Sequence, residues 1–257
     1  MDKRILKGKL KYEGLTFKTK GWGDVLVLEY NGALSVDVKF VDTGYTTTTR
    51  IEDLNNGTIK DYLKPSVFGV GITGTKYPTN EGGVNTKEYA LWKNMLKRCY
   101  SDTCKKKQPT LEDCEVSENF KYYEYFYDWC QNQVGFGNQD WQLDKDLLIK
   151  GNKVYSEDSC VFMPQEINSL LVKCTASRGE YLIGVCWHNT NKAFRAMVRR
   201  NKGKREHLGY FKTELEAFNA YKTAKESFVK EQANEWKGKI DHRAYEALMN
   251  YTVEITD

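Results

Sequence analysis

The chain has 257 residues, of which 40% are hydrophobic, and a formal net charge of +4. This length is enough for two or three compact units, and the composition is that of a folded chain rather than a disordered one. No stretch approaches about eighteen uninterrupted apolar residues, and no apolar signal core follows the first residues. We therefore expect neither a membrane span nor a secretory peptide, and we expect an intracellular protein.

The cysteines argue against both a disulfide framework and a zinc site. There are seven, an odd number with irregular spacing, and none lies in the first 98 residues. That pattern is typical of reduced thiols in an intracellular protein. No Cys-x-x-Cys pair occurs, and the three histidines follow all of the cysteines. Because structural zinc sites need closely spaced ligand pairs, zinc is not expected.

Basic charge is concentrated between residues 173 and 210. This segment has nine Lys or Arg and two Glu, so its net charge is +7, against +4 for the whole chain. Such a concentration favours a polyanionic partner, because neutralised phosphates release condensed counterions. The alternative interpretation is a solvated charged face.

The N-terminal residues alternate between apolar and polar in the manner of strands. Residues 25–30 and 34–40 predict two strands, and Asn31-Gly32 between them is typical of a tight hairpin turn. Further strands at residues 9–18 and 45–51 would complete a curled sheet or small barrel. We assign residues 1–75 to a small antiparallel β domain, whose ligand the sequence does not indicate.

A helical period begins at Thr86. Apolar residues recur on one face of the predicted helix at Tyr89, Trp92, Leu96 and Cys99. Ser117 is the expected N-cap of a second, aromatic-rich helix that continues to Cys130. An aromatic stripe at this spacing favours a core role over base stacking. The same aromatic-rich centre is also a candidate homodimer interface.

A strand, turn, strand and helix follow in the centre of the chain. Residues 141–149 predict a strand that contains Asp144 and Asp146, and residues 150–153 supply turn residues. The chain returns through residues 154–163, and Pro164 begins a short helix over residues 165–172.

The central segments resemble the HNH-type homing endonucleases of bacteriophages. The resemblance is carried by Trp92–Tyr100, Leu143–Asp146, Tyr155–Cys160 and Asn168. It covers about residues 85 to 172, and we assign 85–175 to this unit. It implies a ββα-metal fold, in which a strand carboxylate and a helix residue hold Mg²⁺ or another divalent cation that polarises the scissile phosphate.

Carried over to this chain, the resemblance implies four catalytic candidates. Asp144 or Asp146 would be the strand ligand of the metal, and Asn168 the helix ligand. Lys145 lies at or beside the place of the family's usual catalytic histidine, and a charged lysine is a poor base although it can steady a phosphate. Ser159 lies where the family has an asparagine. The alternative is a degenerate nuclease fold, in which these carboxylates are solvent-facing.

Three strand-like runs form the basic C-terminal part, at residues 181–188, 192–199 and 205–211. Side chains alternate across a strand, so one face of this sheet is expected to be apolar and the other basic. A capping box at Thr213–Glu216 begins a helix with an apolar stripe that can cover the apolar face. We assign residues 178–236 to this module, and residues 237–257, with a helical stretch at 241–251, to a C-terminal tail without a functional interpretation.

The module resembles the ethylene-response-factor type of DNA-binding domain. Gly184-Val185, the Phe-x-Ala-x-Val pattern from Phe194 and the run His207–Phe211 carry the resemblance. It implies that the exposed sheet face enters the major groove of double-stranded DNA. The candidate DNA-binding residues are His188, Arg195, Met197, Arg199, Arg200, Lys204, Arg205 and His207, with Cys186 on the same face and Lys202 in the turn.

Two departures limit what this second resemblance implies. Cys186 and His207 replace a usual arginine and tryptophan, so the target sequence of that family is not transferred. For His188 and His207, a role as metal ligands or buried groups is the alternative to base or phosphate contact.

Together these segments predict an α+β protein: a small antiparallel β domain, a ββα unit preceded by helices, and a three-stranded antiparallel sheet packed on a helix. The predicted function is that of a phage-type, HNH-like homing endonuclease, which hydrolyses DNA phosphodiesters with a divalent cation in the cytoplasm of a bacterial host. The alternative is a catalytically inactive DNA-binding protein, a regulator or a protector of phage DNA, that keeps the nuclease-derived fold.

Overall fold

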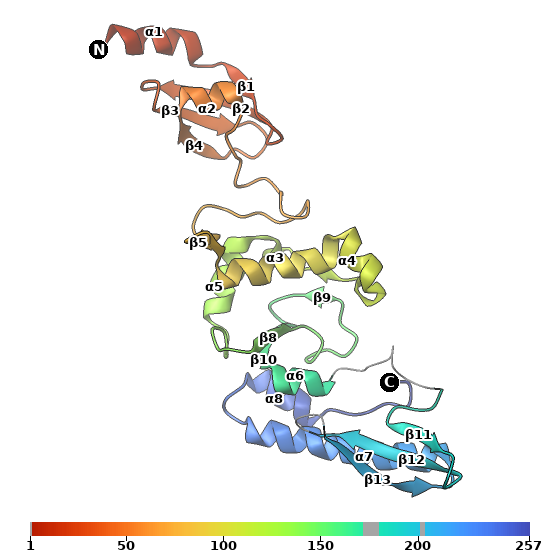
Figure 1. The fold of residues 1–257 in the computed structure, drawn as a ribbon. Coiled ribbons are helices and arrows are strands. Elements are labelled where there is room, and N and C mark those ends of the chain that lie inside the picture. Colours follow the sequence, from red (N-terminus) through yellow and green to blue (C-terminus); the bar gives the residue numbers. More distant parts are fainter. Residues whose placement is uncertain (1, 172–179, 201–203) are drawn as a thin grey trace. The chain divides into compact units, whose positions relative to one another are not determined.

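The structure is a computed structural model, and it describes residues 2–171, 180–200 and 204–257 (Figure 1). It is a mixed α+β structure with antiparallel sheets, which confirms the predicted class at this level. The chain divides into two compact units, residues 1–127 and 128–257, and each is described by itself. None of the helices in the described ranges combines the length and the apolarity that a membrane crossing needs.

The N-terminal part of the first unit is a four-stranded antiparallel sheet. Its strands β1 (Thr16–Lys18), β2 (Asp24–Tyr30), β3 (Val36–Phe40) and β4 (Thr46–Thr49) pair in sequence order. Helix α1 (Lys3–Tyr12) precedes them and packs against β2, and α2 (Ile51–Asn56) follows them. Alternate residues of β2 and β3, among them Phe40, share one core with Leu54 of α2. This is the burial pattern that the alternation predicts.

Helix α1 replaces the strand that was predicted from residue 9. Its N-terminus is capped by Asp2, whose carboxylate accepts a hydrogen bond from the backbone N–H of Arg4 at 2.8 Å. Gly8 is buried against the ring of Tyr30, and a β-carbon there would come within 2.0 Å of Tyr30 Cε1. The residues up to Tyr12 are therefore helical because a local cap and a close helix-to-strand contact outweigh the apparent alternation.

The connection between β2 and β3 is longer than the predicted two-residue turn. It spans residues 31–35 and is closed by a hydrogen bond from Asn31 N to Ser35 O at 2.9 Å. Strand β3 therefore begins at Val36 rather than at Leu34.

The second part of the first unit is mainly helical. Its elements are β5 (Asn80–Glu81), β6 (Val84–Asn85), α3 (Lys87–Tyr100), α4 (Asp102–Lys107), η1 (Pro109–Leu111), β7 (Glu115–Val116), η2 (Asn119–Lys121) and the start of α5 (Tyr123–Gln131). The helical period begins at Thr86 as predicted, and Thr86 caps α3, since its hydroxyl accepts from the N–H of Tyr89 at 3.3 Å. The second helix is interrupted, because Tyr122 is extended between η2 and α5. The aromatic stripe is core: Trp92, Phe120, Tyr123 and Phe126 are all fully buried.

The second unit begins with the strand, strand and helix order that the sequence predicts. Strand β8 (Trp141–Asp144) pairs antiparallel with β10 (Val161–Pro164), with Asp144 opposite Val161, and α6 (Gln165–Leu171) follows. The short strand β9 (Val154–Tyr155) lies between them in the chain. Strand β8 ends at Asp144 rather than at residue 149, because the Asp144 carboxylate caps a turn there. The last residue of the predicted helix, Val172, lies outside the described residues.

The C-terminal sheet consists of β11 (Val185–His188), β12 (Ala193–Arg199) and β13 (Arg205–Phe211), in that order and antiparallel. Helix α7 (Glu214–Glu235) packs against all three strands (Figure 1). Its capping box is formed by Thr213 and Glu216, as predicted. This part of the chain is a three-stranded sheet on a helix.

Helix α8 (His242–Met249) and the residues after it belong to the core rather than to a separate tail. Leu248 and Ala244 of α8 are buried in one cluster with Val161 and Ile167 of the ββα element and with Val229 of α7. The end of the chain joins a second cluster, which contains Val198, Phe218, Tyr221 and Val253. The ββα element and the three-stranded sheet therefore share α7 as a common support, whereas α8 packs with the ββα element.

Candidate nucleic-acid interface

The sheet register brings most of the predicted DNA-binding residues together on one face. Cys186, Arg195 and Tyr210 are cross-strand neighbours in β11, β12 and β13. Further along, Met197 lies opposite His207, and Arg199 opposite Arg205. We call this set the outer face; its members are Cys186, His188, Arg195, Met197, Arg199, Arg205, His207 and Tyr210.

The other side of the sheet is covered by α7. Ala196 and Val198 are fully buried there, next to Phe218 and Tyr221 of the helix. Alternation along β12 is thus as predicted, with apolar residues toward the helix and Arg195, Met197 and Arg199 on the outer face.

A β-bulge in β13 decides which residues of that strand reach the outer face. Ala196 pairs with Gly209, but the next residue, Met197, pairs with His207, so Leu208 is an extra residue. Gly209 takes a φ of +140°, a value that glycine adopts most readily. Because of this extra residue, His207 and Tyr210 lie on the same side of the sheet although they are three residues apart.

The outer face is electropositive. Arg199 and Arg205 are exposed at one end of the strands, and the described residues provide neither with an ion-pair partner. Arg195 lies nearer the centre, where hydrogen bonding to Cys186 and then the neighbouring Tyr210 raise the pKa of its guanidinium further. Its Nε is buried and has no hydrogen-bond partner within the described residues. None of the outer-face residues has a carboxylate side chain.

Arg200 does not join the outer face. Its guanidinium pairs with Glu206 of β13 and with Glu231 of α7, and it lies 5.1 Å from the ring centroid of Phe228. It therefore belongs to the helix side of the sheet, where it neutralises the one carboxylate of β13. Lys204 is exposed at the start of β13, where its carbonyl accepts from Arg200 N at 2.9 Å. Lys202 lies outside the described residues.

Tyr210 is a candidate that the sequence did not identify. Its ring centroid lies 4.9 Å from that of His188 and 4.7 Å from that of His207, and 43% of the residue is exposed. Strict alternation from His207 would place Gly209, not Tyr210, on this face. The placement of Tyr210 on the outer face depends on the bulge, and the sequence signal for that bulge is the Leu208-Gly209 pair before Tyr210.

The predicted catalytic residues lie around the end of β8. Asp144 Oδ1 accepts hydrogen bonds from the backbone N–H groups of Asp146 and Leu147, at 2.8 and 2.7 Å. Burial raises the pKa of the Asp144 carboxyl, although these backbone hydrogen bonds oppose the shift. Lys145 is buried, and its Nζ donates to Asp146 at 2.5 Å and to the carbonyl of Asn152 at 2.9 Å. Lys145 and Asp146 therefore neutralise each other.

Asn168 lies on α6 and reaches back to β8. Its Nδ2 donates to Gln142 Oε1 at 3.0 Å, and Gln142 is two residues before Asp144 on the same side of the strand. The structure thus directs Asn168 toward the strand that carries Asp144. Within the described ranges, no group of three or more His, Cys, Asp or Glu side chains is arranged to hold a metal ion. Ser159 is buried and bonds to Ser156 and to the carbonyl of Val154.

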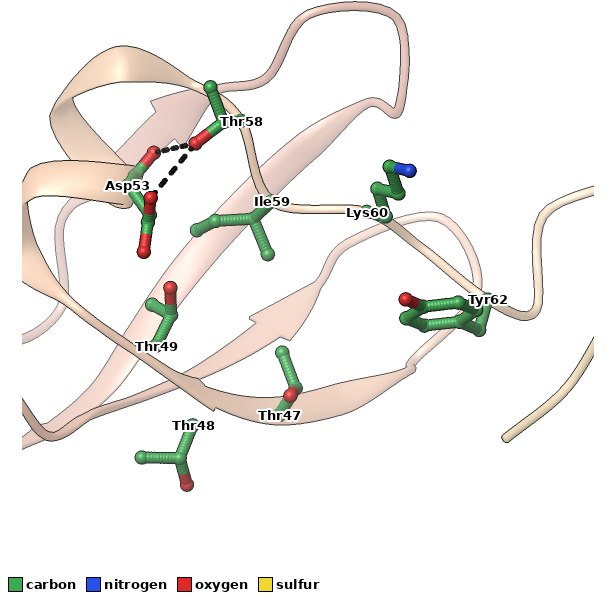
Figure 2. A pocket seen from close by; sticks show the side chains of 8 residues that line it. All are labelled: Thr47, Thr48, Thr49, Asp53, Thr58, Ile59, Lys60 and Tyr62. Atoms are coloured by element: carbon green, nitrogen blue, oxygen red, sulfur yellow. Dashed lines mark hydrogen bonds between the residues drawn. The ribbon is translucent and has the colours of Figure 1, made fainter. Parts of the chain in front are cut away.

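A shallow polar recess lies in the N-terminal domain (Figure 2). It has a volume of about 300 Å³ and is lined by residues of β4, α2 and the segment after α2: Thr47, Thr48, Thr49, Asp53, Thr58, Ile59, Lys60 and Tyr62. Thr58 closes one wall by donating to the Asp53 carboxylate at 3.2 Å. The lining offers hydroxyl groups and one charge of each sign, a set that indicates no particular ligand.

Comparisons with protein-family models, with curated proteins and with solved structures give no match to this chain.

Proposed function

We propose that this protein binds double-stranded DNA through the outer face of its three-stranded sheet. The observation that carries the proposal is the segregation of charge across this sheet. Three arginines and two histidines lie on the outer face without a carboxylate, while Glu206 and Arg200 are paired on the helix side. A surface of this kind attracts the phosphate backbone and releases its counterions.

The shape of the element supports the same partner. Strands of a small antiparallel sheet can lie in a groove of the duplex, where arginine can bond bidentately to guanine. Arg199 and Arg205 are exposed side chains at the end of the strands, which suits phosphate contact. Arg195, near the centre and held between Cys186 and Tyr210, is better placed for a base edge.

A double substitution tests this proposal. Arg199→Gln with Arg205→Gln removes two cations from the outer face, so the slope of log affinity against log salt should fall by about 1.8. The matched control is Lys230→Gln with Lys237→Gln, which removes the same charge from exposed positions in and after α7. Titration of duplex DNA at several salt concentrations measures both. Equal slopes for the parent and the outer-face variant would overturn the proposal.

A second candidate function is metal-dependent hydrolysis of DNA at β8 and α6. The specific observation is that Asn168 bonds to Gln142, on the side of β8 that also carries Asp144. A carboxylate and an amide oxygen are hard donors of the kind that Mg²⁺ prefers. Asp144 and Asn168 would hold the cation, which when bound polarises a phosphate and stabilises the departing oxygen. Lys145 Nζ donates to the Asp146 carboxylate and to the Asn152 carbonyl, so in this proposal Lys145 has a structural role.

Single substitutions separate the roles of the two carboxylates. With plasmid DNA and Mg²⁺ or Mn²⁺, Asp144→Asn should abolish cleavage, because it removes the charged ligand. Asp146→Asn should leave cleavage measurable, because its partner is Lys145. Chelator is the control for metal dependence. DNA binding by a parent protein that cleaves none of a varied DNA panel would favour a catalytically silent DNA-binding protein instead.

A further inference from the structure

An aromatic cluster occupies the middle of the outer face. Tyr210 lies between the imidazoles of His188 and His207, and the three rings come from the two outer strands of the sheet. Arg195 and Cys186 are the cross-strand neighbours of Tyr210. The cluster therefore lies beside the guanidinium of Arg195, on a surface that α7 does not cover.

These rings differ from the other aromatic residues of the sheet in what they contact. Phe194 makes edge-on contacts with the rings of Tyr181 and Trp187, and its cross-strand partner is Phe211. Tyr210 contacts only imidazoles in the described ring pairs. Tyr210 belongs to none of the described core clusters, and the bulge at Leu208 turns its side chain toward the outer face.

An exposed aromatic ring within a cationic sheet suits a particular feature of nucleic acids. Bases inside a duplex are already stacked on one another, so a side chain in the groove meets only their edges. An unpaired base offers its flat face, and aromatic rings on open sheets stack on such faces while neighbouring cations hold the phosphates. Tyr210 adds this capacity without adding charge.

We propose that Tyr210, flanked by His188 and His207, is a stacking site for an unpaired nucleobase of DNA. The inference rests on the proposed binding of DNA by the same face. It adds that this face also accepts a strand whose bases are free, with the arginines on the phosphates and the Tyr210 ring on a base. His188 Nδ1 accepts from the backbone N–H of Asn191 at 3.3 Å, which fixes the orientation of one flanking ring.

The test compares two strands with the same number of phosphates. One is an oligothymidylate of about 20 nucleotides, and the other is an abasic strand of equal length. The parent protein should bind the strand with bases about 5- to 150-fold more tightly, the range for stacking of one base. Tyr210→Ala should reduce this ratio to near one, while Tyr210→Phe should keep it. The salt dependence should not change in either variant, because no charge is removed.

The outcomes separate this inference from the proposed function. Equal affinity of the parent for the two strands would overturn the stacking site, even if duplex DNA binds normally. Tyr210→Phe keeps the aromatic ring, so it should keep the preference for the strand with bases. Loss of this preference in Tyr210→Phe as well as in Tyr210→Ala would therefore also overturn the stacking site. Loss of duplex binding in the Arg199 and Arg205 variant tests the interface alone and leaves the base-dependent ratio to be measured separately.

A photochemical experiment provides a second readout. A strand with 5-iodouracil in place of thymine should crosslink to Tyr210, or to His188 or His207, and mass spectrometry would locate the adduct. Circular dichroism and thermal unfolding of Tyr210→Ala check the fold, which should be kept because the residue lies outside the core clusters. Crosslinks confined to other parts of the chain would contradict the site.

Discussion

Gly184 packs directly against the ring of Tyr221. A β-carbon on residue 184 would come within 2.1 Å of Tyr221 Cδ2, and Gly184 has a φ of +78°. Its carbonyl accepts a hydrogen bond from Met197 N at 2.9 Å. This glycine therefore sets how closely the chain before β11 approaches α7, and with it the position of the sheet on the helix.

Replacing Gly184 by alanine should destabilise the protein by about 2–4 kcal/mol, because the methyl group overpacks Tyr221 and the residue disfavours positive φ. Gly151→Ala is a matched control: it has the same φ of +78° but open space around it. The control should lose only about 1 kcal/mol. Denaturant unfolding measures both, and equal losses would show that the contact with Tyr221 contributes nothing.

Removing the side chain of Leu248 should destabilise the second unit by about 2–5 kcal/mol, because it leaves a cavity in a shared core. Leu248 is 1% exposed and is clustered with Val161 and Ile167 of the ββα element. The control is Leu215→Ala on α7, where 53% of the residue is exposed and the loss should be small. An equal loss of stability in the two variants would contradict the assignment of α8 to the core.

The sequence predicts local features of this fold well. Strand β13 has the predicted bounds, β12 begins one residue later than predicted, and the capping box at Thr213 is where expected, although β11 begins at Val185 rather than at residue 181. These features depend on alternation and on hydrogen bonds between residues close in the chain. Helix α1 is one of the local elements that differ from prediction, since the contact between Gly8 and Tyr30 joins residues far apart in sequence.

Features that depend on distant partners could not be predicted in the same way. The bulge at Leu208 is a property of the pairing between β12 and β13, so the sequence alone does not place Tyr210 on the outer face. The prediction for Arg200 is wrong for a different reason, because this residue follows Arg199 and therefore lies on the other side, where it pairs with Glu206 and Glu231. The sequence shows that α8 has apolar residues, but it does not show that these residues pack against β10 and α6. For the candidate nuclease site, Asp144 was identified from sequence, whereas its capping of the turn follows only from the structure.

The adjacent residues Arg199 and Arg200 should differ sharply in DNA binding. Arg199 is exposed on the outer face, so Arg199→Gln should weaken affinity and lower the salt slope by about 0.9. Arg200→Gln should leave the slope nearly unchanged, because Glu206 and Glu231 already neutralise that side chain. Its effect should be on stability, by about 1 kcal/mol or less. A salt titration that ranks the two variants in the opposite order would contradict the assignment of faces.

Cys160 and Cys186 should differ in their reactivity toward an alkylating agent, and the labelling of Cys186 should also report on DNA binding. Burial raises the pKa of the Cys160 thiol to about 12, so native Cys160 should resist iodoacetamide near pH 8. Cys186 is partly exposed on the outer face and should be alkylated. Bound DNA should slow alkylation of Cys186 but not of Cys104, a partly exposed thiol in the other unit. Mass spectrometry of the labelled peptides measures all three, and unchanged labelling of Cys186 with DNA would count against contact there.

The pH dependence of stability should reveal the Asp144 carboxyl. Its pKa is raised above the ordinary 3.8 chiefly by burial, so the folded state binds this proton more tightly than the unfolded state. The stabilising effect of that proton is complete below the ordinary value and is lost as pH rises through the raised value. Asp144→Asn keeps an oxygen acceptor for the N–H groups of Asp146 and Leu147 but has no proton to lose. Relative to this variant, the parent should therefore become less stable as pH rises from 4 toward 7. Thermal unfolding of both proteins across this range measures the difference, and a constant difference would mean that Asp144 titrates alike in the folded and unfolded states.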